Sequence, residues 1–266
     1  MWIRTTCNLE FRLEVPTPLI LMLRARSSAR QWIARESYSL IPNVPVQEYT
    51  DIFGNLCQRL IAPAGEFQVR TSAVAILNVS PDQAPVGGFV DIPDLPDTAM
   101  MYLLPSRYCE SDRFGNMARE IVAGLPLGYP QVAGISDWIR SSIRYAPGTS
   151  AFPISAVEVN LQGQGVCRDL SHLGIALCRA LSIPARMVVG YLHELDPMDM
   201  HSWFEAYIGN RWHTFDPSCS SLHDGARLAV AYGRDAADVA IYTQFGPPAR
   251  FSDMEVTVQQ LENAPD

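Results

Sequence analysis

A two-residue turn signal, Gly209-Asn210, joins two runs of strand-forming residues in the stretch HSWFEAYIGNRWHTFDPS. A glycine-asparagine pair between such runs is typical of a tight β-hairpin, because both residues tolerate the positive φ angles of the turn. The turn also sets the register, since Ile208 must then pair with Arg211 and the pairing continues outward along both strands. The sequence therefore predicts an antiparallel hairpin here.

This register brings a histidine and a carboxylate together. Trp203 lies opposite Asp216, and His201 lies opposite Ser218. His201 and Asp216 then share one face of the sheet as diagonal neighbours, about 5–8 Å apart, a separation that a side-chain hydrogen bond can close. A carboxylate beside an imidazole fixes its tautomer and stabilises its protonated form.

A cysteine follows a glycine turn and opens a predicted helix in the stretch GQGVCRDLSHLGIALCRALSIPAR. The helix is expected over residues 167–181 and ends before Pro184. Cys167 occupies its first turn, where free backbone N–H groups and the helix dipole favour a thiolate. The glycines at 163 and 165 let the backbone approach a substrate, and the N–H of Cys167 is a candidate oxyanion donor.

Each of these features also has a purely structural interpretation. A single cysteine is often a small buried residue, and a histidine beside an aspartate is often a structural pair. Taken together, the helix and the hairpin predict a Cys-His-Asp arrangement made by Cys167, His201 and Asp216, in which an imidazolium activates the thiol as a nucleophile.

The charged residues exclude several functions. All 20 cationic residues are arginine, so Schiff-base and lysine-nucleophile chemistry are ruled out. The net charge is −8 and no basic run is present, which argues against nucleic acid as a partner. The proposed thiol chemistry needs no cofactor, and none is predicted.

The cysteines and the amino-terminal segment indicate the cellular compartment of the protein. The start of the chain has no apolar segment followed by a small-residue cleavage site, and no membrane span is visible, so no membrane association is expected. No CxxC pair occurs, and we expect reduced thiols in a cytoplasmic protein. A metal site made by His193, His213 or His223 with Cys167 or Cys219 is an alternative, but no compact metal spacing supports it. The six cysteines are Cys7, Cys57, Cys109, Cys167, Cys178 and Cys219.

The pattern of the chain changes near residue 105. Residues 8–15 alternate apolar and polar side chains, as a half-buried strand does, and further extended runs are expected at 19–24, 29–40, 56–62 and 67–79. Residues 80–105 are rich in proline and disfavour regular helix. Helices are predicted at 114–123 and 132–143, and strands at 185–192, 202–208, 211–216, 238–244 and 254–258.

These elements predict an α+β protein with an N-terminal antiparallel β-sandwich domain over 1–105 and a second domain over 106–266. In the second domain the helix that carries Cys167 is expected to pack on an antiparallel sheet that carries His201 and Asp216.

A set of short motifs then resembles the transglutaminase-like cysteine hydrolase superfamily, in particular its bacterial members. The motifs are Gly165-Val-Cys-Arg-Asp169, Ile183-Pro-Ala-Arg186, Gly190-Tyr191, His201-Ser-Trp-Phe-Glu205, and Trp212 followed by Phe215-Asp-Pro-Ser218. Residues 48–55 and the turn at 62–65 are similar to the bacterial transglutaminase-like N-terminal β domain. The resemblance implies a papain-like core in which Cys167 is the nucleophile, His201 the general base and acid, and Asp216 the orienting carboxylate.

The family often uses a side chain upstream of the cysteine as a second oxyanion donor. Candidates for this role or for substrate contact are Gln162, Gln164, Tyr145 and Trp203. Trp138 is a further candidate, although its helical spacing favours a place in the core.

The sequence therefore predicts a thiol-dependent hydrolase or acyl transferase, a cysteine protease, amidase or transglutaminase-type enzyme. Its substrate would be a peptide, a protein or a small amide, and an amine acceptor would be needed for transfer. The alternative is a non-catalytic binding or scaffold protein on the same fold, in which the β domain docks a partner. The oligomeric state stays open.

Overall fold

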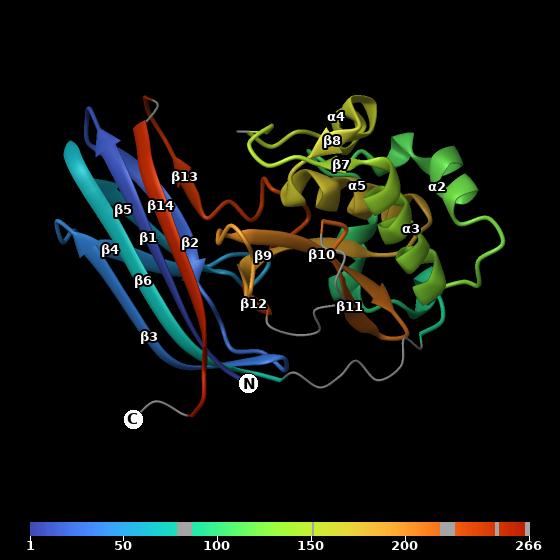
Figure 1. The fold of residues 1–266 in the computed structure, drawn as a ribbon, viewed down its shortest axis with the longest axis horizontal. Coiled ribbons are helices and arrows are strands. Elements are labelled where there is room, and N and C mark those ends of the chain that lie inside the picture. Colours follow the sequence, from blue (N-terminus) through green and yellow to red (C-terminus); the bar gives the residue numbers. More distant parts are fainter. Residues whose placement is uncertain (79–86, 151, 219–226, 248–249, 264–266) are drawn as a thin grey trace.

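The computed structural model describes residues 1–78, 87–150, 152–218, 227–247 and 250–263 of the 266-residue chain. Two bodies lie side by side in Figure 1, one built of long strands and the other of a sheet with helices. The protein is thus a mixed α and β structure with several antiparallel sheets. None of the helices in these ranges is both long and apolar enough to cross a membrane.

The first body consists of two antiparallel sheets of four strands within the described residues. One has the order β14-β1-β6-β3, with strands Arg250–Leu261, Trp2–Leu13, Gly65–Leu77 and Gln31–Ile41. The other has the order β13-β2-β5-β4, with strands Tyr242–Gln244, Thr17–Arg24, Leu56–Ala62 and Val46–Thr50.

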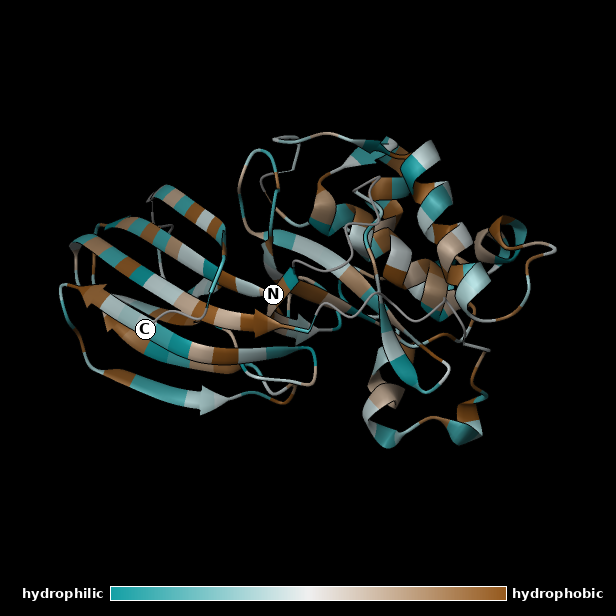
Figure 2. Ribbon diagram, turned by 60° about the horizontal axis from the view of Figure 1, so that its bottom comes forward, coloured by the Kyte–Doolittle hydropathy of each residue, from teal (hydrophilic) through white to brown (hydrophobic). Residues whose placement is uncertain are grey.

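Alternating apolar side chains hold these two sheets together. Leu9 and Phe11 of β1 are buried in the same cluster as Leu19 and Leu21 of β2, so both sheets contribute to one core. Figure 2 shows the matching alternation of hydrophilic and hydrophobic residues along the strands. The alternation predicted for residues 8–15 is confirmed within β1, whereas Val15 lies beyond the strand and is 42% exposed.

The end of the chain returns to the first body. β14 pairs with β1 along its length, and β13 pairs with β2. The sequence-based division places β13 and β14 in the second domain, residues 106–266, whereas in the structure both strands pair with strands of the first body. A strand's hydrophobic pattern shows that it is half-buried, but it does not show which distant strand will be its neighbour.

The second body is built on the antiparallel sheet β11-β10-β9-β12. Its strands are Arg211–Phe215, His201–Ile208, Ala185–Leu192 and Arg227–Gly233. It is accompanied by the helices α2 (Gly115–Ile121), α3 (Tyr129–Ser142), α4 (Ala156–Gln162) and α5 (Cys167–Ala180), together with a short parallel pair, β7 (Arg144–Tyr145) and β8 (Gln164–Gly165). Helices α2, α3 and α5 and strands β9, β10 and β11 agree closely with prediction, whereas α4, β4 and β12 were not predicted.

The proline-rich segment is less extended than its composition suggests. Residues 79–86 lie outside the described part, but the rest forms short helical turns, α1 (Asp97–Met100) and the 3₁₀ turns η1 (Ile92–Asp94) and η2 (Met101–Leu103). A further 3₁₀ turn, η3 (Ser111–Arg113), precedes α2. Pro96 immediately precedes α1, a position where proline does not interrupt helical hydrogen bonds, so a short helix is compatible with the proline content.

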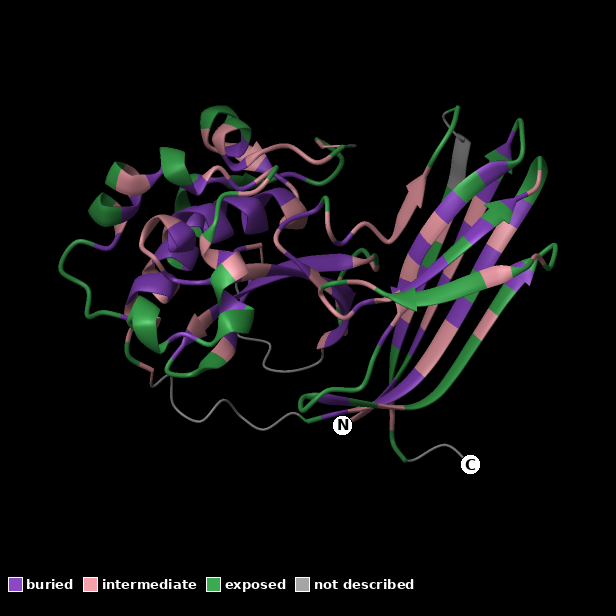
Figure 3. Cartoon of the chain, turned by 180° about the vertical axis from the view of Figure 1, so that it is seen from behind, coloured by how far each residue is buried: buried purple, intermediate pink, exposed green. Residues whose placement is uncertain are grey.

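Helix α5 packs tightly on the sheet because of one glycine. A Cβ atom at Gly174 would lie 2.6 Å from Cε1 of Phe204 on β10, far inside contact distance. Figure 3 shows α5, β9 and β10 almost wholly buried, so the helix that carries Cys167 is held rigidly against the strand that carries His201.

Two amide side chains join the bodies at the edge of the second sheet. Gln31 accepts from the N–H of Ala229 at 2.9 Å and donates to its carbonyl at 2.8 Å. Asn55 makes the same two contacts with Tyr232, both at 2.8 Å. These side chains satisfy backbone groups that an edge strand such as β12 would otherwise expose.

Candidate active site

Cys167 is the first residue of α5. Val166 before it is extended and caps the helix, and Cys167 is partly exposed. The first N–H groups of a helix point toward its start without an intrahelical acceptor, and in α5 the backbone bonds to the Val166 carbonyl begin with the N–H of Asp169. The position therefore supplies both a favourable field for a thiolate and donors for a developing oxyanion.

The predicted hairpin is confirmed. Gly209 and Asn210 have φ angles of 54° and 63°, as the two-residue turn requires. Ile208 pairs with Arg211, and the ladder continues to Phe204 opposite Phe215. Asp216 follows the last paired residue, which leaves its side chain free to turn toward β10.

His201 and Asp216 form a close buried pair. Nε2 of His201 lies 2.7 Å from Oδ2 of Asp216. Cys167 is the second side chain that interacts with His201 and raises its pKa, and because Nε2 faces the carboxylate, Nδ1 is the nitrogen left for the thiol. The side chains of His201 and Asp216 are 2% and 5% exposed, so water screens their interaction little.

The electrostatics favour the charged form of both partners. Burial lowers the pKa of His201, but hydrogen bonds to Asp216 and Cys167, and the charges of both, outweigh it and raise the pKa to about 10. Burial raises the pKa of Asp216, but the His201 hydrogen bond, the His201 charge and Arg227 hold it well below its usual range. The imidazole is therefore cationic near neutral pH, as activation of a neighbouring thiol requires.

The other described thiols differ sharply from Cys167. All of them are free and buried. Burial raises the pKa of Cys7 to about 12, and it raises the pKa of Cys57, Cys109 and Cys178 as well. A thiol that stays protonated is a poor nucleophile, so these four cysteines are structural. Cys219 lies outside the described residues.

The residues next to Cys167 stabilise the start of the helix. Asp169 is fully buried and accepts from the N–H of Val166 at 3.2 Å. Arg168 donates to Asp169 at 3.0 Å and to Ser150 and the carbonyl of Phe152. Arg168 and Asp169 thus form an ion pair at the start of the helix.

Gly165 has a packing role. A Cβ atom there would lie 2.9 Å from Cβ of Asp169, so the glycine is needed to fit against the helix.

The remaining histidines have other partners. His172 is fully buried; Nδ1 donates to the carbonyl of Ile154 at 2.9 Å and Nε2 accepts from the N–H of Ala236 at 3.1 Å, which fixes a neutral ring. Nε2 of His213 accepts from Arg211. His193 lies 3.9 Å from Glu194, and His223 is outside the described residues. In the part of the chain that is described, no His, Cys, Asp and Glu side chains group as a metal site would need.

The candidate oxyanion and substrate residues separate into two groups. Tyr145 on β7 pairs with Gly165 on β8, and Gly165 is two positions before Cys167 in the sequence. The Tyr145 side chain is 43% exposed. Gln164 lies on β8 beside Gly165, and its side-chain oxygen accepts a hydrogen bond from Arg144. Gln162 is exposed at the end of α4.

The two tryptophans are less accessible. Trp203 is 2% exposed, with its ring stacked on His201 at 6.3 Å, so it lies behind the histidine. Trp138 packs against the core of the second body, in agreement with its helical spacing.

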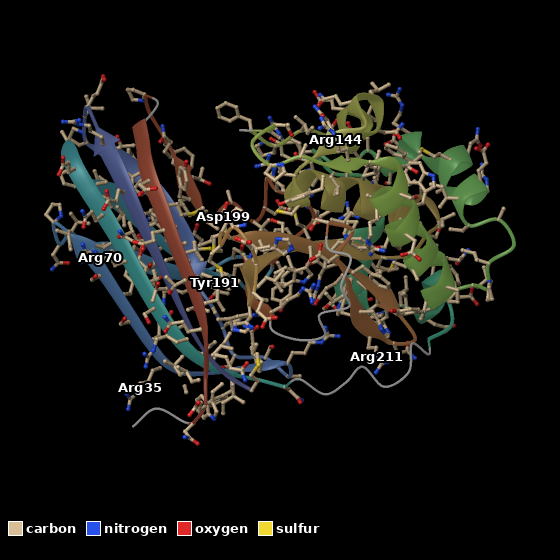
Figure 4. All side chains as sticks on the ribbon, viewed as in Figure 1. Arg35, Arg70, Arg144, Tyr191, Asp199 and Arg211 are labelled. Carbon is tan, nitrogen blue, oxygen red and sulfur yellow. The ribbon has the colours of Figure 1, made fainter. Side chains whose placement is uncertain are left out.

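Three more residues adjoin this site, and of these only Ser218 was predicted to lie near it, opposite His201. Ser218 donates to Oδ1 of Asp216 from both its N–H and its hydroxyl. Arg227 on β12 donates to Oδ2 at 3.2 Å. Asp199 precedes β10 and interacts with the charge of His201; Figure 4 places it and Tyr191 on the side of the second body that faces the long strands.

Comparison with known proteins agrees with this architecture. The sequence profile of the transglutaminase-like superfamily matches residues 115–217, which contain Cys167, His201 and Asp216. A solved structure described as a "Putative Cysteine Protease from Cytophaga hutchinsonii" is 33% identical, with a TM-score of 0.90, and the match covers 100% of this chain and 92% of that one. An uncharacterized protein of Mycobacterium leprae is 27% identical over 256 residues, 89% of each chain. The chain belongs to the transglutaminase-like superfamily.

Proposed function

We propose that the protein is a thiol-dependent hydrolase or acyl transferase that acts on a peptide or carboxamide bond. The observation that carries the proposal is one imidazole that lies between a buried carboxylate, at 2.7 Å, and the partly exposed Cys167 at the start of a helix. Membership of the superfamily and the similarity to the Cytophaga hutchinsonii protein support an enzyme over a scaffold.

In the proposed reaction the Cys167 thiolate attacks the carbonyl carbon and a tetrahedral oxyanion forms. The N–H groups at the start of α5 would stabilise it, and Tyr145 is our candidate for a side-chain donor. The C–N bond then breaks as His201 gives its proton to the leaving amine or ammonia, which leaves a thioester on Cys167. Asp216 keeps the imidazole oriented throughout.

The thioester is resolved by a second nucleophile. His201, now neutral, takes a proton from water or from an acceptor amine, which attacks the thioester and releases the thiolate. Hydrolysis and transfer differ only in this acceptor, and we favour hydrolysis because water is abundant while transfer needs a protected acceptor site. The free thiols suit a reducing compartment, and we propose the cytoplasm.

The proposal can be tested with 4-nitrophenyl acetate, an activated ester. We expect a burst of 4-nitrophenolate and an acetyl group on Cys167, detected by peptide mass spectrometry, with faster turnover when an amine is added if transfer dominates. Cys167→Ala should abolish the burst, and the matched variant Cys57→Ala should retain it. An equal burst from Cys167→Ala would exclude thioester chemistry at this residue.

A further inference from the structure

Four donors surround the Asp216 carboxylate. Oδ1 accepts from the Ser218 N–H at 3.1 Å and from its hydroxyl at 2.6 Å. Oδ2 accepts from His201 at 2.7 Å and from Arg227 at 3.2 Å. One carboxylate oxygen is therefore shared between an imidazolium and a guanidinium.

Arg227 is held in place from a second side. Its guanidinium carbon lies 5.9 Å from the centre of the Trp203 ring, and that ring stacks on His201 at 6.3 Å with an interplanar angle of 26°. The Arg227 side chain is 14% exposed and that of Asp216 is 5% exposed. Arg227, Trp203, His201 and Asp216 thus form a closed ring of contacts that is largely shielded from water.

We infer that Arg227 is a positioning residue that limits the basicity of His201 by sharing Oδ2 of Asp216. The inference rests on the proposed function, in which His201 must first hold a proton and then release it to the leaving group. A second cation on the carboxylate weakens its stabilisation of the imidazolium and repels it directly. A catalytic acid whose pKa lies far above the working pH transfers its proton poorly, so this restraint favours the reaction.

The direction of the effect follows from the titratable and charged groups around His201 and its carboxylate. Cys167 from α5, Asp216 after β11 and Asp199 before β10 interact with His201 itself, and Arg227 from β12 contacts Oδ2 of Asp216. Of these, only Arg227 is positive. Removing its charge must therefore raise the pKa of His201, provided that Asp216 stays in place, and the two Ser218 hydrogen bonds hold Asp216 independently.

The test is an NMR titration of the His201 ring in a Cys167→Ser background. This background removes the thiolate, so the result depends on the arginine and the carboxylate alone and not on whether the protein is an enzyme. We expect Arg227→Met to raise the pKa of His201 by about one pH unit, from Coulomb repulsion over a few ångströms in a partly buried site. Arg227→Lys should stay close to the parent value.

The matched control is Arg234→Met, which removes an arginine just beyond the other end of β12, where it pairs with Asp238 at 2.8 Å. It should leave the His201 titration unchanged. An unchanged or lowered pKa in Arg227→Met, in a protein whose thermal melting shows that it is folded, would overturn the inference. Failure of the 4-nitrophenyl acetate burst with a raised pKa would instead reject the enzyme proposal and leave the role of Arg227 intact.

Discussion

Asp216→Asn is expected to reduce the reactivity of Cys167 strongly, although less than loss of His201 itself. The substitution keeps the shape of the side chain but removes the charge that offsets the burial of His201. The pKa of His201 then falls, because only Cys167 still opposes the effect of burial. A smaller fraction of the imidazole is cationic near neutral pH, so it stabilises the thiolate less.

The expected size follows from the loss of that ion pair. Because the thiolate is the form that reacts, weaker stabilisation by the imidazolium should lower the rate of alkylation by iodoacetamide at near-neutral pH roughly 10- to 100-fold. The matched control is Asp238→Asn, which removes a carboxylate that pairs with Arg234 away from Cys167. If Cys167 is alkylated at the wild-type rate in both variants, Asp216 does not control the reactivity of the Cys167 thiol.

Arg179→Met is expected to have the largest effect on stability. Arg179 lies in the last turn of α5, is 4% exposed, and donates to the carbonyl groups of Ala185, Leu104 and Arg234 and to the Ser106 hydroxyl. It therefore ties the helix to β9, to the end of β12 and to the segment before α2.

Methionine fills much of the same volume but leaves these buried acceptors without donors. The cost should be about 3 kcal/mol or more of the free energy of unfolding, measured by urea denaturation. Arg140→Met, which removes an exposed ion pair with Asp137 on α3, should change the free energy of unfolding by less than about 0.5 kcal/mol. Equal effects of the two variants would show that Arg179 does not join these segments.

Local patterns predicted the parts of the site that lie close together in sequence. The Gly209-Asn210 turn fixed the register of β10 and β11, and so the proximity of His201 to Asp216. The glycine turn and the following periodicity placed Cys167 at the start of α5. These predictions succeeded because a two-residue turn and a helix terminus are determined by a few neighbouring residues.

The partners that come from distant segments could not be predicted. Arg227 reaches Asp216 from β12, an edge strand whose short run of small and apolar residues gives little indication of its neighbour. The pairing of β14 with β1 could not be predicted for the same reason, because the two strands lie at opposite ends of the sequence. Gln31 and Asn55, which bind the edge of β12, read in the sequence as ordinary polar residues at a strand start and a turn.

The central claim is that Cys167 is activated by His201, and the most direct measurement is the alkylation rate of each cysteine by iodoacetamide from about pH 5 to about pH 9, in wild type and in His201→Ala. We predict rapid labelling of Cys167 well below pH 8, slowed strongly in His201→Ala, with the buried thiols of Cys7 and Cys57 slow in both proteins. Labelling of Cys167 no faster than that of Cys7 or Cys57 in the wild-type protein would contradict the account.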